Sequence, residues 1–215
     1  AVFNFAAGEY ELASDMLEIA YDEIEPVNLT FKASGDVAFS GNDSHSIMSI
    51  KGAHVTLDGI RVIKSVAKES FTGAIKVSGT NSKLTLKGCS VVGNSADGYE
   101  ITSSCFAVSD GALLTATDCS FTGNSAYSAP VLYVNGASVN MTNCRFENNE
   151  ATENAGVVYV DGNAMPTFNN CVFTGNRALK WGMIHHQKGT TTFNECTFTD
   201  NTIDSGWDGG VLAAC

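Results

Sequence analysis

The stretch Cys119-Ser-Phe-Thr-Gly-Asn124 returns three times later in the chain, as Cys144-Arg-Phe-Glu-Asn-Asn149, Cys171-Val-Phe-Thr-Gly-Asn176 and Cys196-Thr-Phe-Thr-Asp-Asn201. A variant, Cys89-Ser-Val-Val-Gly-Asn94, precedes these four copies. The intervals between the five cysteines are 30, 25, 27 and 25 residues. Sequence repeats of this length are typical of solenoids, in which each repeat forms one coil and stacks on its neighbours.

Two further phrases fall between these copies. An apolar segment such as Gly156-Val-Val-Tyr-Val160 follows the asparagine, and an apolar-Thr-apolar segment such as Leu84-Thr-Leu86 precedes the cysteine. Each repeat therefore holds three short segments with period-two alternation, and a bend at the position of Gly88 separates two of them. No helical periodicity occurs within the repeats. The pattern predicts an all-β chain, a right-handed parallel β-helix of about seven coils over residues 28–215.

Stacking the repeats places equivalent residues in columns inside the coil stack. We expect three structural ladders, of cysteines, phenylalanines and asparagines: Cys89, Cys119, Cys144, Cys171 and Cys196; Phe121, Phe146, Phe173 and Phe198; and Asn94, Asn124, Asn149, Asn176 and Asn201. Stacked rings bury a large apolar area, and an asparagine at a bend can hydrogen-bond the coils on both sides.

Residues 1–27 depart from the repeat pattern. Met16, Leu17, Ala20 and Ile24 have helical spacing, so we expect an N-terminal cap containing a helix, which would cover the open end of the stack. The last repeat reaches Cys215 without a comparable segment. We therefore expect either further sequence after this point or end-to-end self-association through the last coil.

The composition excludes several classes of partner. The 12 basic and 23 acidic residues give a net charge of −11, which repels nucleic acid phosphates. No apolar run is long enough to span a membrane, so we expect no direct membrane insertion. Hydrophobic residues make up 44% of the chain and charged residues 16%, which is the balance of a folded domain.

The paired phrases resemble the repeats of the chlamydial-type polymorphic outer membrane proteins, within the pectate-lyase-like right-handed β-helices. Phe-x-x-Asn is clear at four positions, and the second phrase is degenerate, as in Gly73-Ala-Ile75 and Gly209-Gly-Val-Leu212. The resemblance covers roughly residues 45–215. It implies an extracellular or cell-surface location and a repeat region that mediates adhesion.

One column of expected outward residues ends in aromatic side chains. Tyr133, Tyr159 and His185 follow one another, and Trp181 and Trp207 precede the same strands. These residues could form a platform for sugar rings, or they could pair as ordinary cross-strand neighbours. His186 falls in a column of buried aliphatic residues, where a hydrogen-bonded core histidine is the simplest interpretation.

The cysteine ladder could bind a metal or form disulfides, but Ile60 occupies the same column, which favours small buried hydrophobes. We therefore predict no metal site and no cofactor. Acidic residues are scattered through the loops without a pair that the repeats would force together, so we predict no catalytic residues.

An outward column of threonines raises the alternative of ice binding, against the plain explanation of β-propensity on an exposed face. Asp58 and Lys87 lie beside this column, which consists of Thr30, Thr56, Thr85, Thr115, Asn140, Thr167 and Thr192. Three sequons, at Asn28, Asn42 and Asn140, permit N-glycosylation in a secretory eukaryote. The preferred prediction is a non-catalytic surface or adhesion module whose partners are surface proteins or glycans. The main alternative is a carbohydrate-binding or polysaccharide-active protein.

Overall fold

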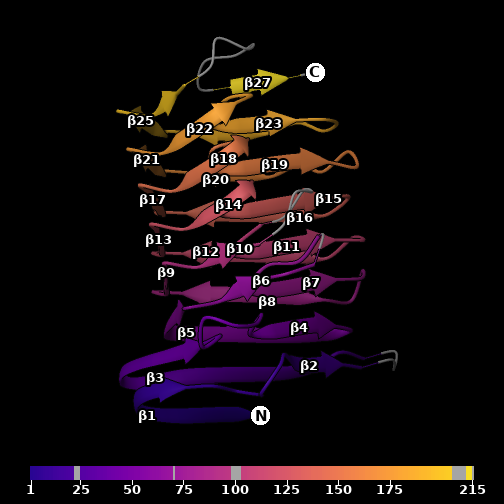
Figure 1. Ribbon diagram of the computed structural model, residues 1–215. Helices are drawn as coiled ribbons and strands as arrows, with labels where there is room; N and C mark the ends of the chain where they lie inside the picture. The colour runs from indigo at the N-terminus through magenta and orange to yellow at the C-terminus, as the bar shows by residue number, and fades with distance from the viewer. Residues whose placement is uncertain (22–24, 70, 98–102, 205–211, 215) are drawn as a thin grey trace.

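The strands of the chain form three parallel sheets that wind around one core. The computed structural model describes residues 1–21, 25–69, 71–97, 103–204 and 212–214. No helix occurs in these ranges, and every strand pair between neighbouring coils is parallel. Figure 1 shows the coils stacked from β1 at the N-terminal end to β27 at the C-terminal end. The all-β class and the stack of about seven coils are confirmed.

Sheet A is the largest of the three and has thirteen described strands. They are β1 (Val2–Tyr10), β3 (Val27–Ser40), β5 (Ala53–Ile63), β8 (Lys83–Lys87), β9 (Ser90–Val92), β12 (Leu113–Thr117), β13 (Ser120–Thr122), β16 (Ser138–Thr142), β17 (Arg145–Glu147), β20 (Thr167–Asn169), β21 (Val172–Thr174), β24 (Thr192–Asn194) and β25 (Thr197–Thr199).

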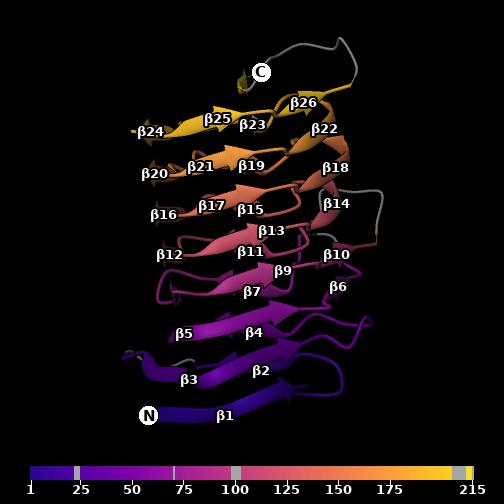
Figure 2. The ribbon, with the colours of Figure 1, turned by 90° about the vertical axis from the view of Figure 1, so that its left-hand side faces the viewer.

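Sheets B and C complete each coil. The eight described strands of sheet B are β2 (Leu17–Ala20), β4 (Met48–Lys51), β7 (Ile75–Ser78), β11 (Phe106–Ser109), β15 (Leu132–Asn135), β19 (Val158–Asp161), β23 (Ile184–His186) and β27 (Leu212–Ala214). The six of sheet C are β6 (Val66–Ala67), β10 (Ser95–Ala96), β14 (Ser125–Ser128), β18 (Glu150–Asn154), β22 (Arg177–Lys180) and β26 (Thr202–Ile203). The view in Figure 2 shows the strands of each sheet one above another.

A bend divides sheet A in the later coils. The residue before each ladder cysteine has a left-handed backbone, with φ of 55° at Gly88, 54° at Asp118 and 55° at Asn143. Glycine, asparagine and aspartate tolerate this conformation better than other residues. The bend predicted at Gly88 is therefore a feature of every later coil, and it turns the following cysteine toward the interior.

Phenylalanine rings stack face to face along the interior. Phe121 and Phe146 have ring centroids 4.9 Å apart, and the distance from Phe146 to Phe173 is 4.4 Å, with planes inclined by 13° and 4°. All three side chains are fully buried, and Phe198 extends the stack at 4.6 Å from Phe173. In-register pairing of β13, β17, β21 and β25 produces this column.

Asparagine side chains tie the same coils together at the next turn. The Asn124 Nδ2 donates to Asn149 Oδ1 at 2.9 Å, and the backbone N–H of Asn124 donates to the same oxygen at 3.1 Å. Asn149 repeats both bonds to Asn176, and its Nδ2 also donates to the carbonyl of Phe121. Each buried amide thus satisfies backbone groups that the turn leaves unpaired.

The helix predicted near the N-terminus is wrong. Leu17–Ala20 form strand β2, which pairs with β4, so that Leu17 lies beside Met48 and Ile19 beside Ile50. The apolar residues of this short run also fit a period of two, and pairing with β4 selects the strand. Ile24 lies outside the described residues. The preceding strand β1 pairs with β3, and Phe5 packs on Phe39 at 5.0 Å. No helix in the described ranges is long and apolar enough to cross a membrane.

Candidate functional site: a groove over sheet B

A shallow groove crosses the outer face of sheet B in the N-terminal half of the stack. Its larger part, about 480 Å³, lies over β2, β4 and β7 and is lined by Glu18, Lys51 and Lys76, among others. The smaller part, about 270 Å³, extends over β11 and β15 to Tyr133 and shares Lys76 and Asp110 with the first. In-register parallel strands place these outward side chains at regular intervals of about 4.8 Å along the groove.

Charges of both signs line this groove. Lys51 is exposed and Lys76 is half-buried, and neither forms an ion pair with another described residue. Glu18 lies on β2, whereas Asp110 directly follows β11, three strand steps away. Asp110 also lies three residues beyond Ala107, the residue in register with Glu18, so at the usual strand spacing and rise the two acids are roughly 17 Å apart. The two carboxylates of glycosidases are about 5–9.5 Å apart, so this pair does not have their geometry.

An aromatic side chain stands at one end of the groove. The Phe71 ring is 46% exposed and lies over Tyr133, with ring centroids 5.3 Å apart and planes inclined by 47°. The backbone of Phe71 has φ of 57°, a left-handed conformation that is unfavourable for a bulky residue. Burial raises the pKa of Tyr133, so its hydroxyl group stays neutral.

The described residues of the predicted aromatic platform do not form an exposed surface. Tyr133, Tyr159 and His185 do lie on the outer side of sheet B, but their exposed fractions are 2%, 4% and 0%. Ala129 and Ala155, which precede β15 and β19, pack against the two tyrosines, and the half-buried Trp181 packs against this cluster. These side chains therefore form a second, smaller core. Trp207, the other predicted member, lies outside the described residues. Of the predicted set, Tyr133 lines the groove.

The histidine at the centre of this second core is His185, which the sequence placed in the outward platform, whereas His186 was the residue expected in a buried column. The His185 ring stacks on Trp181 at 4.6 Å and meets Tyr159 at 4.8 Å, and among the described residues neither ring nitrogen has a hydrogen-bond partner. Burial lowers the pKa of His185 below its ordinary value of 6.5. His186 is half-buried, and its Nε2 lies 2.7 Å from the hydroxyl group of Thr191.

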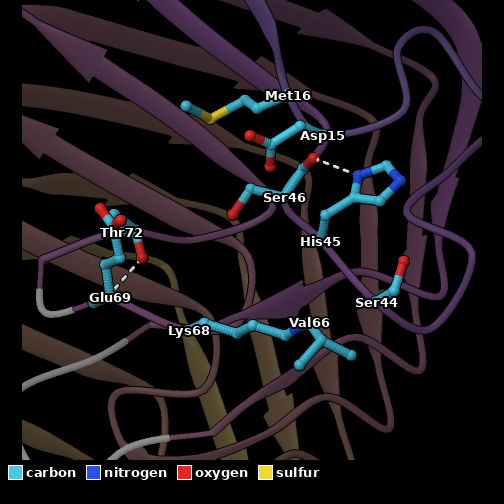
Figure 3. A pocket seen from close by; sticks show the side chains of 9 residues that line it. All are labelled: Asp15, Met16, Ser44, His45, Ser46, Val66, Lys68, Glu69 and Thr72. Atoms are coloured by element: carbon cyan, nitrogen blue, oxygen red, sulfur yellow. Dashed lines mark hydrogen bonds between the residues drawn. The ribbon is translucent and has the colours of Figure 1, made fainter.

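Figure 3 shows a second hollow, of about 210 Å³, between Asp15, His45 and Thr72. His45 is 8% exposed, and its Nδ1 donates to the carbonyl of Ser46 at 2.7 Å while its Nε2 faces the Glu11 carboxylate at 3.0 Å. Burial by itself would lower the pKa of His45, but Ser46 and Glu11 outweigh it and raise the pKa. Both ring nitrogens are thus engaged in structural bonds, and His45 is not a free base.

The ladder cysteines form no disulfide with one another, and four of the five are buried. Cys89, Cys119, Cys144 and Cys171 are free and buried, and Cys196 is half-buried. Their thiols donate to backbone carbonyls, as Cys144 does to Thr142 at 3.3 Å. The hydrogen bond with Cys144, together with burial, raises the pKa of Cys119 to about 12. Among the described residues, no group of three or more histidine, cysteine or acidic side chains is arranged to hold a metal ion.

The three sequon asparagines all lie on the surface. Asn42 is exposed in the turn after β3, Asn28 is exposed on β3, and Asn140 is exposed on the outer face of β16. The Asn28 amide is engaged with Pro26 and His54. The groove residues Phe71, Lys51 and Glu18 were not singled out from the sequence. The one available signal was the 29-residue interval between Ile60 and Cys89, which contains Phe71 and is longer than the intervals after Cys119.

Comparison with known proteins identifies the fold family. A family model described as a right-handed β-helix region matches residues 30–214. A search of the curated proteins and a search of the solved structures found no match. The matched span covers most of the chain and includes the strands of the three sheets from within β3 onward. The chain therefore belongs to the right-handed β-helix family.

Proposed function

We propose that this chain is a non-catalytic, extracellular or cell-surface module that binds glycans in the groove over sheet B. The observation that carries the proposal is the combination of unpaired lysines, separated carboxylates and one exposed aromatic ring along an in-register groove. Sugar hydroxyl groups accept bonds from ammonium groups and donate to carboxylates, and sugar rings stack on aromatic faces.

Two further points support a surface role. The repeats resemble those of the polymorphic outer membrane proteins, in which such a region mediates adhesion. The roughly 17 Å between Glu18 and Asp110 suits recognition along an extended ligand and not the paired acid–base chemistry of glycoside cleavage. Glycans on a neighbouring cell, or on other surface proteins, are therefore the proposed partners.

The proposal is tested with a glycan array, followed by calorimetric titration of the best ligands. Phe71→Gly removes the exposed ring and suits a left-handed backbone, and Lys76→Ala removes the charge shared by both parts of the groove. We expect each variant to weaken binding about tenfold or more, which corresponds to about 1.4 kcal/mol.

Lys87→Ala, on the exposed face of sheet A, is the matched control and should bind as the wild type does. The proposal fails if the array shows no ligand, or if Lys87→Ala weakens binding as much as Lys76→Ala. Release of reducing ends or unsaturated sugars from a bound polysaccharide would show instead that the chain is an enzyme.

A further inference from the structure

The outer face of sheet A carries two columns of small uncharged side chains in the C-terminal half of the stack. The first column runs through Thr115, Asn140, Thr167 and Thr192. The second, two residues further along each strand, runs through Thr117, Thr142, Asn169 and Asn194. We call these eight residues of β12, β16, β20 and β24 the Thr/Asn face. Figure 2 shows these four strands one above another.

Within these two columns, charged residues occur only in the N-terminal half of the stack. Asp58 on β5 and Lys87 on β8 occupy the second column, directly before Thr117. From β12 onward, both columns contain only threonine and asparagine. In this part of the stack the two columns themselves carry no charge on a chain whose net charge is −11, and the exposed Asp118 and Glu195 border them at the bend.

A rigid layer lies beneath the Thr/Asn face. Strand alternation directs Phe168 and Phe193 inward, where their rings stack at 5.3 Å with planes inclined by 13°. On the outside, the Asn194 side chain donates to the Asn169 side-chain oxygen at 2.7 Å, which fixes one amide relative to the next. The side chains of the face are therefore held at the spacing of the strands.

The spacing and chemistry of the Thr/Asn face suit a lattice of ordered water. Neighbouring residues repeat at about 4.8 Å across the strands and at roughly 6.6 Å along them. Threonine offers a methyl group beside a hydroxyl group, so it can order water without holding a tight hydration shell of its own, as a charged side chain would. No aromatic side chain points outward from these four strands, and a flat polysaccharide surface would call for stacking rings.

We propose that the Thr/Asn face binds the surface of ice crystals. Its site is separate from the groove over sheet B, so each function can fail without the other. The wild-type protein should inhibit ice recrystallisation and show thermal hysteresis at micromolar concentration.

The sharpest variant pair is Thr167→Tyr and Thr56→Tyr. Both threonines are half-buried and belong to the same outward column, but Thr167 lies on the Thr/Asn face and Thr56 lies beside Asp58 on β5. A tyrosine on the face would hold the crystal away from its neighbours. We expect Thr167→Tyr to lose most of the ice activity and Thr56→Tyr to keep it, with both melting temperatures close to that of the wild type.

Three outcomes overturn the proposal. The first is a folded wild-type protein with neither recrystallisation inhibition nor thermal hysteresis. The second is an equal loss of activity in the two tyrosine variants. The third is co-sedimentation with insoluble cellulose or chitin, lost in Thr167→Tyr, without any ice activity, which would assign the face to crystalline polysaccharide.

Discussion

At the scale of single residues, the buried asparagines form hydrogen bonds between coils that no apolar residue could form. The Asn149 side-chain oxygen accepts two bonds from Asn124, and its Nδ2 donates to the Asn176 side-chain oxygen and to the carbonyl of Phe121. Removing one amide leaves several buried polar groups without partners, whose desolvation is then uncompensated.

Asn149→Ala should therefore lower the free energy of unfolding by about 3 kcal/mol. Asn143→Gly is the control, because glycine suits the left-handed backbone at this position and Asn143 belongs to an exposed ladder in which its Nδ2 donates to Asp118 and its oxygen accepts from Asn170. The control should cost only about 0.5 kcal/mol. Urea denaturation followed by circular dichroism measures both values, and similar losses in the two variants would contradict the ladder's role.

His185 should make the stability of the folded protein depend on pH, and the direction of its pKa shift gives the sign of this dependence. Because burial lowers its folded pKa below the ordinary value of 6.5, the unfolded state binds the proton more readily. The contribution of His185 to the free energy of unfolding is complete above about pH 6.5. It is lost as the pH falls through the pKa of the folded state.

His185→Phe keeps a ring between Trp181 and Tyr159 and should be less sensitive to acid than the wild type. The measurement is the difference in melting temperature between the two proteins from pH 8 to pH 5. This difference should shift in favour of the variant as the pH falls. A constant difference over this range would show that His185 stays neutral in both states or is accessible to solvent.

At the scale of elements, the cysteine ladder fills an apolar column of the core with thiols that also form weak hydrogen bonds. The thiols fill the corner after each bend and donate weakly to carbonyls, and the raised pKa values of Cys119 and Cys144 keep these two thiols protonated. A buried protonated thiol is a poor nucleophile.

Alkylation should therefore follow burial along the ladder. Iodoacetamide at pH 7.5 should modify the half-buried Cys196 first, whereas Cys119 and Cys144 should react only after unfolding in urea. Peptide mass mapping of a time course distinguishes these sites. Modification of Cys144 before Cys196 in folded protein would mean that the stack opens locally at that coil.

Individual strands show which parts of the fold could be predicted from the sequence and which could not. The strands of the later repeats were predictable, because apolar residues alternate and a turn residue follows at each bend. The segment Leu17–Ala20 was not, because four residues fit both a helix and a strand until β4 offers a partner. The column of Tyr133 and Tyr159 does face outward, but residues that precede each strand cover it, and alternation carries no information about such covering.

At the scale of the whole molecule, the acidic surface opposes the compact stack. Because the net charge is −11, like charges on the surface repel one another, and salt screens this repulsion. Salt also weakens the exposed ion pairs, such as those of Arg177 with Glu150 and Asp204, but exposed pairs contribute little.

The melting temperature should therefore rise with ionic strength. Between 10 mM and 200 mM sodium chloride we expect a gain of about 2–4 °C, which corresponds to roughly 1 kcal/mol for a chain of this size. Differential scanning calorimetry at constant pH measures it. A lower melting temperature in salt would show that ion pairs across neighbouring coils outweigh the general repulsion.

The sequence by itself determined the coil. Cys-x-Phe-x-x-Asn at intervals near 25 residues specifies one buried cysteine, one stacking ring and one bridging amide per repeat, and identical columns stack in register because equal side chains pack best on one another. Only the tertiary structure decided what covers each outer face. The groove beside Phe71 and the burial of His185 both depend on which residues before each strand fold back over sheet B. Those outcomes follow from contacts between coils, which a local pattern of residues does not encode.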